Sequence, residues 1–600
     1  MGERFNCRPA TARLAAILGV VIQAGPAQAH AFGARYDLPL PLEFYLAGAA
    51  AAVALSFVVM ALFFRAPPGN TDRPSLDQHG SLPIRIHPIA VYVLQIASVG
   101  LFLLVIAAGF FGTQEPSANI GPTFIWIIWW VGLAYLVALV GDLWPAINPW
   151  SIIYSWIERL AALARPGSRP RRHLHYPSWL GAWPAAFLFG VFAWFELVDE
   201  TAQIPRTLAI AILFYSGVTW AGMAAFGRTV WLANGEAFSL FFKTFGRFAP
   251  VGGLPDHPDS RRQRWYLRPY ASALIVDEPC KLSMTAFVIV MLATVTFDGF
   301  KETPLWGDLL QWIASAPVFN PGIRVLHDLG FNVQVAIETA VLAGFPLMFL
   351  LVYLGFSWLT KLASGDRRPV IEIAGLFVFS LVPIAIAYHL AHYLSYLLIG
   401  GQFLIPLASD PFGAGWNLFG TVGYRANIGI IDAKFVWYTS VFAIVIGHVV
   451  AVGVAHSVSI RVMASVGNAI RSQFPMLILM VAYTTASLWI LAQPIVGGPE
   501  LTFLQKRSGT VSLVPLQYRE YCLDLTAQDS LEYAFEADGP VDFDIHYHDG
   551  LTVVFPVELT GTTGHTGQFS PNESQSYCLM WSNRGLSRAS MEYRIGRALY

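Results

Sequence analysis

Long apolar runs recur along this 600-residue chain, and they limit its possible folds more than any other feature. Ten of them come close to the roughly 20 residues that an α-helix needs to cross a bilayer. Charged residues make up only 12% of the chain, about half of the share usual in soluble proteins. We therefore expect a mainly α, polytopic helical membrane bundle. The predicted spans are 41–64, 88–111, 120–144, 179–198, 208–226, 282–297, 333–359, 370–398, 434–455 and 474–496.

Basic residues divide the predicted loops into two alternating sets, which gives the bundle an orientation. The loop at 159–172 alone carries five arginines. Loops on the opposite side carry only Arg206, Lys301, Arg324 and Arg425. Because Lys and Arg gather on the cytoplasmic side of membrane proteins, both ends of a ten-span bundle should face outward. The sequence therefore predicts a multi-pass protein of a bacterial inner membrane.

The N-terminus has the pattern of a secretory signal peptide over residues 1–29. Three basic residues precede a short apolar core: Arg4, Arg8 and Arg13. Ala27, Gln28 and Ala29 then form an A-x-A cleavage site. Cleavage would make His30 the periplasmic N-terminus of a membrane domain at 30–497. The alternative is an uncleaved first anchor.

Residues 498–600 differ in character, because polar and apolar residues alternate between Gly, Asn and Asp turns. This pattern predicts a periplasmic β-sandwich. Of the four cysteines, Cys7 would leave with the signal peptide and Cys280 would lie at the cytoplasmic face. Cys522 and Cys578 remain as the exported pair, and we expect a disulfide between them in an oxidising compartment.

Five ionisable residues on four predicted spans fall at a similar depth in the outer leaflet. They are Glu196, Asp298, Glu338, His389 and His392. Such residues are costly in a bilayer and are candidates for function. His389, His392 and Glu338 are the predicted ligands of a divalent transition metal (zinc, iron, manganese or copper), with Asp298 and Glu196 as catalytic groups or further ligands. The alternative is that each polar group only joins helices by hydrogen bonds.

Three further histidines are secondary metal candidates. His546 and His548 alternate on one predicted strand, so both face the same side. His30 could bind copper through its amine and imidazole. His565, Cys578 and Met580 could complete a copper site, although a cysteine ligand would compete with the disulfide. Surface histidines without a metal are the alternative.

Two polar interruptions of the apolar pattern also suggest local structure. The segment "GDLWPAINPW", 141–150, predicts a broken helix end. The segment "ANGEAFSLFFKTFGRFAP", 233–250, is amphipathic and predicts a helix lying in the membrane interface.

Several motifs together resemble bacterial polytopic membrane proteins of the fenitrothion hydrolase type. They are "HAFGARYDLPLPLEFYLAGAA", "GDLWPAINPW", "NGEAFS", "TFDGF" and "AYHLAHYLSYLL", within 30–496. The resemblance implies cleavage of the aryl ester bond of an organophosphorus triester, a small apolar substrate reached from the lipid bilayer. A metal of the kind predicted above would activate water for this reaction. No nucleic-acid partner is expected, and a protein partner is left open.

Two other functions fit the same residues. In the first, His30, the His546/His548 strand and the intramembrane histidines would pass copper inward. In the second, a proton-coupled transporter would use Glu196, Asp298, Glu338 and His448 as relay groups.

Overall fold

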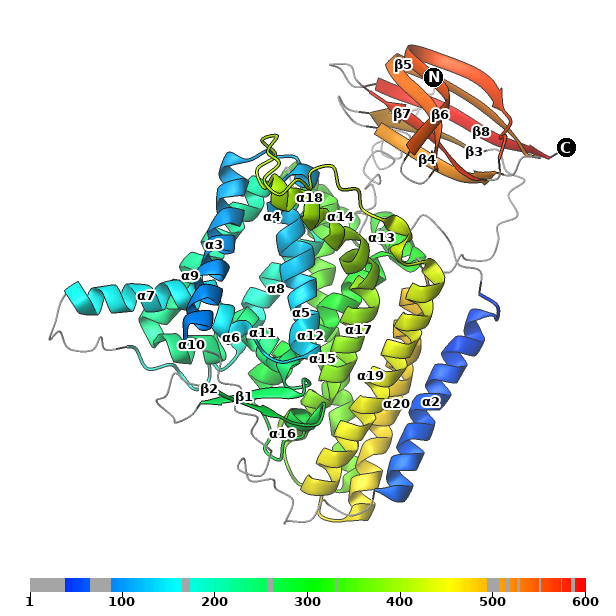
Figure 1. Ribbon diagram of the computed structural model, residues 1–600. Helices are drawn as coiled ribbons and strands as arrows, with labels where there is room; N and C mark the ends of the chain where they lie inside the picture. The colour runs from blue at the N-terminus through cyan, green and yellow to red at the C-terminus, as the bar shows by residue number, and fades with distance from the viewer. Residues whose placement is uncertain are drawn as a thin grey trace, which may run out of the picture. The chain divides into compact units, whose positions relative to one another are not determined.

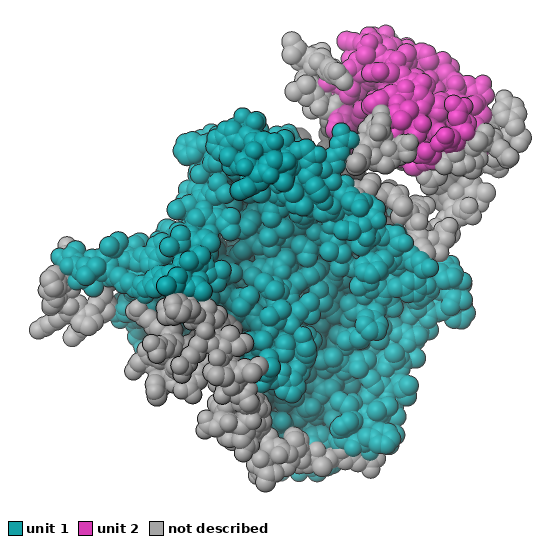
Figure 2. All heavy atoms as spheres, viewed as in Figure 1, with its two compact units in different colours: residues 1–497 teal, residues 498–600 magenta. Residues whose placement is uncertain are grey.

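The computed structural model describes residues 38–64, 88–164, 173–199, 201–255, 263–329, 332–493, 507–513, 518–525, 529–549, 552–573, 575–583 and 589–599. The chain forms two compact units, Met1–Gly497 and Gly498–Tyr600, which are described separately below (Figure 2). The predicted signal peptide and His30 lie outside the described residues.

The first unit is helical, and within the described ranges nine helical segments are long and apolar enough to cross a membrane. This confirms the expected mainly helical architecture (Figure 1). The candidate spanning segments are Leu42–Phe63, Ile89–Phe111, Ile120–Leu139, Pro205–Phe226, Leu282–Lys301, Val333–Ser364, Val370–Ser409, Ala433–Val462 and Val466–Ala492. The main helices among them are α2 (Leu42–Phe63), α3 (Pro88–Phe111), α9 (Pro205–Phe226), α12 (Leu282–Lys301), α15 (Val333–Ser364), α19 (Ala433–Val462) and α20 (Val466–Ala492).

The fourth predicted span, 179–198, is a shorter helix than expected. Its helix α8 covers Trp183–Leu197, only 15 residues. At about 1.5 Å per residue it is roughly 22 Å long, whereas the hydrocarbon core is about 30 Å thick. The residues before it form turns instead, and Gly181 there has a positive φ of 44°.

Two spanning segments change helix type along their length. The segment at Ile120–Leu139 contains the π-helix η2 (Thr123–Gly132) followed by α5 (Leu133–Leu139). The segment at Val370–Ser409 runs through α16 (Val370–Phe377), η4 (Val378–Leu381), α17 (Val382–Ser395), η5 (Tyr396–Gly400), η6 (Gly401–Phe403) and α18 (Leu404–Ser409). Such changes of pitch turn side chains away from a regular helix face and are frequent at functional sites.

Short helices fill the space between the spans. The broken helix end at 141–150 is present, as α6 (Trp144–Ile147) followed by α7 (Pro149–Ala164). The remaining short elements are α4 (Ile120–Pro122), α10 (Arg228–Asn234), α11 (Ala237–Gly246), α13 (Pro304–Ser315), α14 (Asn320–Asp328), the 3-10 turns η1 (Pro116–Ala118), η3 (Ser272–Leu274) and η7 (Ile428–Ile430), and the hairpin of β1 (Val251–Pro255) and β2 (Gln263–Leu267).

Helix α11 is buried inside the bundle, so its predicted place in the interface was wrong. Phe238, Phe241, Phe242 and Phe245 are all at most 3% exposed. Phe238 and Phe241 pack against aromatic residues of η2 and α8. The side chain of Glu236 accepts hydrogen bonds from two main-chain amides of the first turn and so caps the helix where it enters the bundle.

The second unit is an all-antiparallel β domain, which confirms the all-β part of the prediction, and its described strands are linked in one six-stranded sheet. Its strands are β3 (Arg507–Leu513), β4 (Tyr518–Leu525), β5 (Asp529–Asp549), β6 (Thr552–Phe569), β7 (Gln575–Ser582) and β8 (Ala589–Leu599). They lie in the order β3-β8-β5-β7-β4, and β6 pairs with β5. The long strand β5 pairs with β8 along its first part and with β7 along its last part.

One face of this sheet holds an apolar core around Phe543, Leu579 and Trp581, each fully buried. The predicted disulfide is confirmed. Cys522 on β4 and Cys578 on β7 are direct cross-strand partners, and their sulfurs are bonded at 2.06 Å.

Candidate active site in the membrane unit

Asp298, near the end of α12, is the centre of a buried polar cluster. His392 Nε2 lies 2.8 Å from Asp298 Oδ2, and the Tyr393 hydroxyl donates a hydrogen bond of 2.6 Å to the same oxygen. Asp298 and His392 are 7% and 5% exposed. The structure therefore brings together one predicted catalytic acid and one predicted metal ligand from separate spans.

Glycine next to the acid makes this approach possible. A β-carbon at Gly299 would collide with the hydroxyl of Tyr388 on α17. Because glycine has no side chain, α12 and α17 can pack closely at this level. The "TFDGF" motif thus supplies both the carboxylate, Asp298, and the small residue that lets it reach α17.

His389, one turn before His392, is surrounded by aromatic rings. The rings of Trp130, Phe245 and Tyr393 lie 5.5, 5.9 and 4.8 Å from it, centroid to centroid, all edge-on. The Tyr135 hydroxyl donates to the main-chain carbonyls of His389 and Leu390. His389 Nε2 itself is buried with no hydrogen-bond partner. Buried polar atoms are nearly always satisfied, so this nitrogen is suited to a water or a ligand.

A small cavity lies beside His389, and Glu196 of α8 is part of its wall. Its volume is about 20 Å³ for the centre of a water molecule, which is room for one water. Thr294, Tyr393 and the indole of Trp130 supply the other polar groups of an otherwise apolar lining. Glu196 and His389 therefore line this cavity directly, whereas Asp298 and His392 are linked to it through Tyr393.

Glu338 is the exception, because a lysine engages it. Lys301 Nζ lies 2.7 Å from Glu338 Oε2 and also donates to the main-chain carbonyl of Leu197. Gln334 Nε2 donates to Glu338 Oε1 at 2.9 Å. The Lys301 ion pair joins α12 to α15 beside the cluster. Glu338 is thus held by its own partners rather than offered to the histidines.

The metal ligands predicted for this unit do not converge. Of the residues that the structure describes, only Glu520, His546 and Cys578 in the second unit place three His, Cys, Asp or Glu ligand atoms within 4.8 Å of one another. His392 is paired with Asp298, and Glu338 with Lys301. The donor set predicted from the sequence therefore does not fit a single metal ion in this arrangement.

An apolar chamber of about 390 Å³ lies on the other side of Phe192. Phe192 lines both this chamber and the small polar cavity. Apart from its tryptophans, the chamber is lined by two polar side chains, Ser98 and Tyr215. Ser98 donates a hydrogen bond to the carbonyl of Ile147, and Tyr215 donates one to Glu236. The chamber is formed by parts of α3, η2, α6, α7, α8, α9 and α11.

Other histidines have different surroundings. His448 Nδ1 is 2.8 Å from the carbonyl of Ile444 in its own helix, and its ring lies 5.9 Å from that of Tyr483. His456 bonds to Gln473 and to the carbonyl of Phe64. The side chain of His548 lies outside the described part of β5.

The sequence did not predict the roles of Tyr393 and Lys301 in the site or the aromatic side chains that surround His389. Tyr393 follows His392 directly in the "AYHLAHYLSYLL" motif, but a tyrosine in an apolar run gives no distinct signal. Lys301 lies three residues after Asp298, so helical spacing could have placed both on one face. The position of Phe192 between two cavities depends on packing alone.

No protein-family model and no curated protein sequence matches this chain.

Proposed function

We propose that the membrane unit hydrolyses small uncharged esters that reach it from the lipid bilayer. The resemblance to the fenitrothion hydrolase type suggests aryl phosphotriesters as the substrate class. The observation that carries the proposal is the pair of cavities that share Phe192, one apolar and one lined by His389 and Glu196. Together they would place an apolar substrate next to groups that can activate water.

The larger chamber supports an uncharged substrate. No Lys, Arg, Asp or Glu lines it, so a charged phosphate group would lose its hydration there without gaining a partner. Its volume of about 390 Å³ lies within the range usual for small-molecule sites. A neutral triester carries no charge and requires no cationic clamp.

The smaller cavity supplies the chemistry. Glu196 or the unpartnered His389 Nε2 would take a proton from a water molecule as its oxygen attacks phosphorus. The bond from phosphorus to the aryl oxygen then breaks, and the aryl oxide leaves and is protonated. Asp298, held by His392 and Tyr393, fixes the geometry and charge beside this base. General-base catalysis of this kind contributes about 10²- to 10⁴-fold.

No step of this reaction is assigned to a metal, because the predicted ligands do not converge. A divalent metal stays a separate prediction, and elemental analysis of the purified protein tests it. The proposal also keeps the predicted bacterial inner-membrane location, with the second unit on the outer side. The disulfide supports that side, because disulfides persist in oxidising compartments.

The test compares matched changes of buried carboxylates to amides. Membranes containing the full chain, or its Glu196→Gln, Asp298→Asn or Glu338→Gln variant, are assayed for release of the aryl alcohol from paraoxon or fenitrothion. The first two variants should lose at least about 100-fold in rate, whereas Glu338→Gln should stay within a few-fold of wild type. No turnover by wild type, or equal rates in all variants, would overturn the proposal.

A proton relay is the second candidate, and Glu302 favours it. Glu302 directly follows α12, and burial together with the charge of Asp298 raises its pKa to about 7, against the opposing effects of His392 and Lys301. Glu302 could therefore exchange protons near neutral pH between solvent and the Asp298–His392 pair. Proton uptake by proteoliposomes under a pH gradient, lost in Glu302→Gln and present without esterase activity, would favour a proton-coupled transporter.

A further inference from the structure

Metal-binding side chains form two adjacent rows across the second unit, on the face opposite its apolar core. Strand β7 lies between β4 and β5. In the first row Cys578 of β7 pairs with Cys522 on one side and with His546 on the other. In the second row Met580 pairs with Glu520 and Asp544. Residues two apart on a strand face the same way, so six potential ligand or supporting groups share this face.

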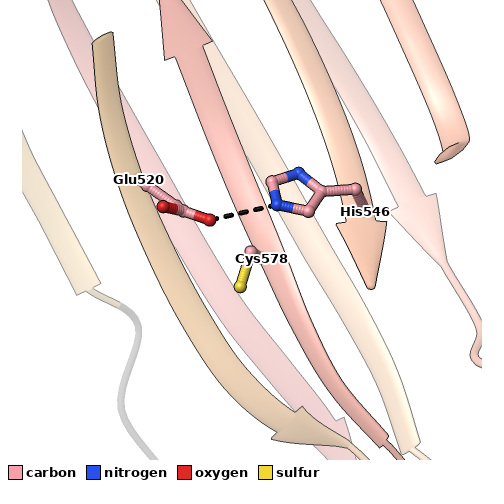
Figure 3. A group of neighbouring side chains, drawn as sticks. All are labelled: Glu520, His546 and Cys578. Carbon is pink, nitrogen blue, oxygen red and sulfur yellow. Dashed lines mark ion pairs between the residues drawn. The ribbon is translucent and has the colours of Figure 1, made fainter. Parts of the chain in front are cut away.

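His546 is oriented toward the centre of this face. Its Nδ1 lies 2.6 Å from Asp544 Oδ1, and its Nε2 lies 3.1 Å from Glu520 Oε1. Figure 3 shows Nε2 of the ring directed toward Glu520, with the sulfur of Cys578 below them. A carboxylate on one imidazole nitrogen and a convergent donor set on the other is the arrangement found around metal-binding histidines.

The sulfur atoms are the missing ligands in the present state. Glu520, His546 and Cys578 have ligand atoms within 4.8 Å of one another, but Cys578 is bonded to Cys522. A metal ion binds thiolates rather than disulfide sulfurs. Breaking the disulfide would leave two thiols next to His546 Nε2 and the Glu520 carboxylate.

We propose that reduction of the Cys522–Cys578 disulfide creates a binding site for a soft metal ion, Cu⁺ or Zn²⁺. Cys522, Cys578, His546 and Glu520 are its ligands, and Asp544 orients His546. Two thiolates with nitrogen and oxygen donors suit tetrahedral Zn²⁺, and the neighbouring thioether of Met580 would favour Cu⁺. This site is independent of the reaction proposed for the membrane unit.

The redox step balances with a dithiol reductant. The dithiol gives up two electrons and two protons and becomes a disulfide, while the protein disulfide takes them up and becomes two thiols. Binding of the ion then releases both thiol protons as the thiolates coordinate. The side chains of Cys522 and Glu520 are exposed, which leaves the disulfide open to the reductant and the ion.

The experiment uses the full chain in detergent, with Cys7 and Cys280 replaced by alanine so that no other sulfhydryl group is present. Oxidised protein is compared with protein reduced by dithiothreitol, which is then removed without oxygen. Zn²⁺ is titrated in one arm, with Co²⁺ as its coloured substitute, and Cu⁺ in the other arm against a coloured Cu⁺ chelator. We expect one more bound ion per chain after reduction, with a thiolate-to-metal absorption band for Co²⁺.

Single substitutions that leave both cysteines in place test the ligand set. His546→Ala should weaken the additional binding by at least about 100-fold, and Asp544→Asn by about 10- to 100-fold. His565→Ala removes a histidine of the same unit that stacks on Tyr533, and it should change nothing. Intramembrane histidines are present in both redox states, so any ion they bind cancels in the comparison.

The two arms identify the ion. Additional binding of Zn²⁺, of Cu⁺ or of both after reduction supports the proposal. No additional ion after reduction, equal binding by oxidised protein, or unchanged binding by His546→Ala would each overturn it. If reduction loosens β4 and β7, the ion should restore their protection from hydrogen exchange in the parent protein but not in His546→Ala. Failure to restore it would also overturn the proposal.

Discussion

His392 in the helical unit and His546 in the β unit are both buried beside carboxylates, but they reach those carboxylates differently. His392 meets Asp298 because two helices far apart in sequence pack closely at Gly299. His546 meets Asp544 along its own strand and Glu520 two strands away. Strand register fixes the neighbours of His546, whereas helix packing fixes those of His392.

This difference affects what each site can do. In the sheet, the donor atoms converge on one point, and a covalent bond between two of them stands in the way of a metal. In the bundle, Asp298 is paired with His392 and Glu338 with Lys301, while Glu196 and His389 line the small cavity. We therefore propose metal binding for the sheet and proton transfer for the bundle.

Removing the Cys522–Cys578 disulfide should cause the largest loss of stability, and this loss should be confined to the β unit. Cys522 and Cys578 are 56 residues apart, and a disulfide that closes a loop of this size stabilises the folded state by about 4 kcal/mol through chain entropy. Hydrogen exchange of β4 and β7 should accelerate accordingly in Cys522→Ser/Cys578→Ser. Protection in α12 and α17 is the internal control, and equal acceleration there would show that the two units do not respond separately.

Replacing Asp298 should cause the second largest loss of stability, in the helical unit. Asp298→Ala leaves His392 and Tyr393 without a shared buried acceptor and should destabilise the membrane unit by about 3 kcal/mol. Asp298→Asn keeps an oxygen for the Tyr393 hydroxyl and should cost less. Thermal unfolding in detergent, followed by intrinsic fluorescence, measures both. Equal losses in the two variants would contradict the assigned hydrogen bonds.

Composition and hydropathy predicted the helical unit well because burial in lipid demands long apolar runs with few exceptions. They overestimated α8, since apolar residues continue into the turns that precede it. Helix α11 was misplaced for a related reason. Its phenylalanines are compatible with burial either in lipid or in the protein interior, and the sequence of one helix does not specify which of the two surrounds it.

The candidate sites were predicted only in part. The i, i+3 spacing of His389 and His392 indicated one shared face, but it could not state that Asp298 would engage His392 alone. In the β unit, the spacing of His546 and His548 indicated a shared side of a strand. It could not state that β5 would lie beside β7, which is what brings Cys578 next to His546. Partners from distant segments are fixed by packing and register, which local patterns do not contain.

Proton binding by Glu302 should make the stability of the helical unit depend on pH. Its folded pKa of about 7 lies above the ordinary 4.5 because burial and Asp298 disfavour its charge. The native state thus binds the extra proton, so stability should be highest below about pH 4.5, fall as the pH rises to about 7 and then level off. With partial solvent screening we expect a change of about 1 to 2 kcal/mol. Unfolding measured across this range should show it in wild type but not in Glu302→Gln.

The prediction with the smallest expected effect distinguishes a hydrogen bond that positions the candidate site from one that only stabilises the fold. Tyr135 and Tyr353 each donate a hydrogen bond to main-chain carbonyls of the segment Val370–Ser409, Tyr135 to His389 and Leu390, and Tyr353 to Ala374. Changing either to phenylalanine removes one hydroxyl and should cost about 1 kcal/mol in thermal unfolding. Only Tyr135→Phe frees the backbone that positions the His389 ring, so only this variant should lower ester hydrolysis, by a few-fold. If Tyr353→Phe lowers the rate equally, the effect arises from the stability of the whole segment, and the Tyr135 hydrogen bond does not specifically position the His389 ring.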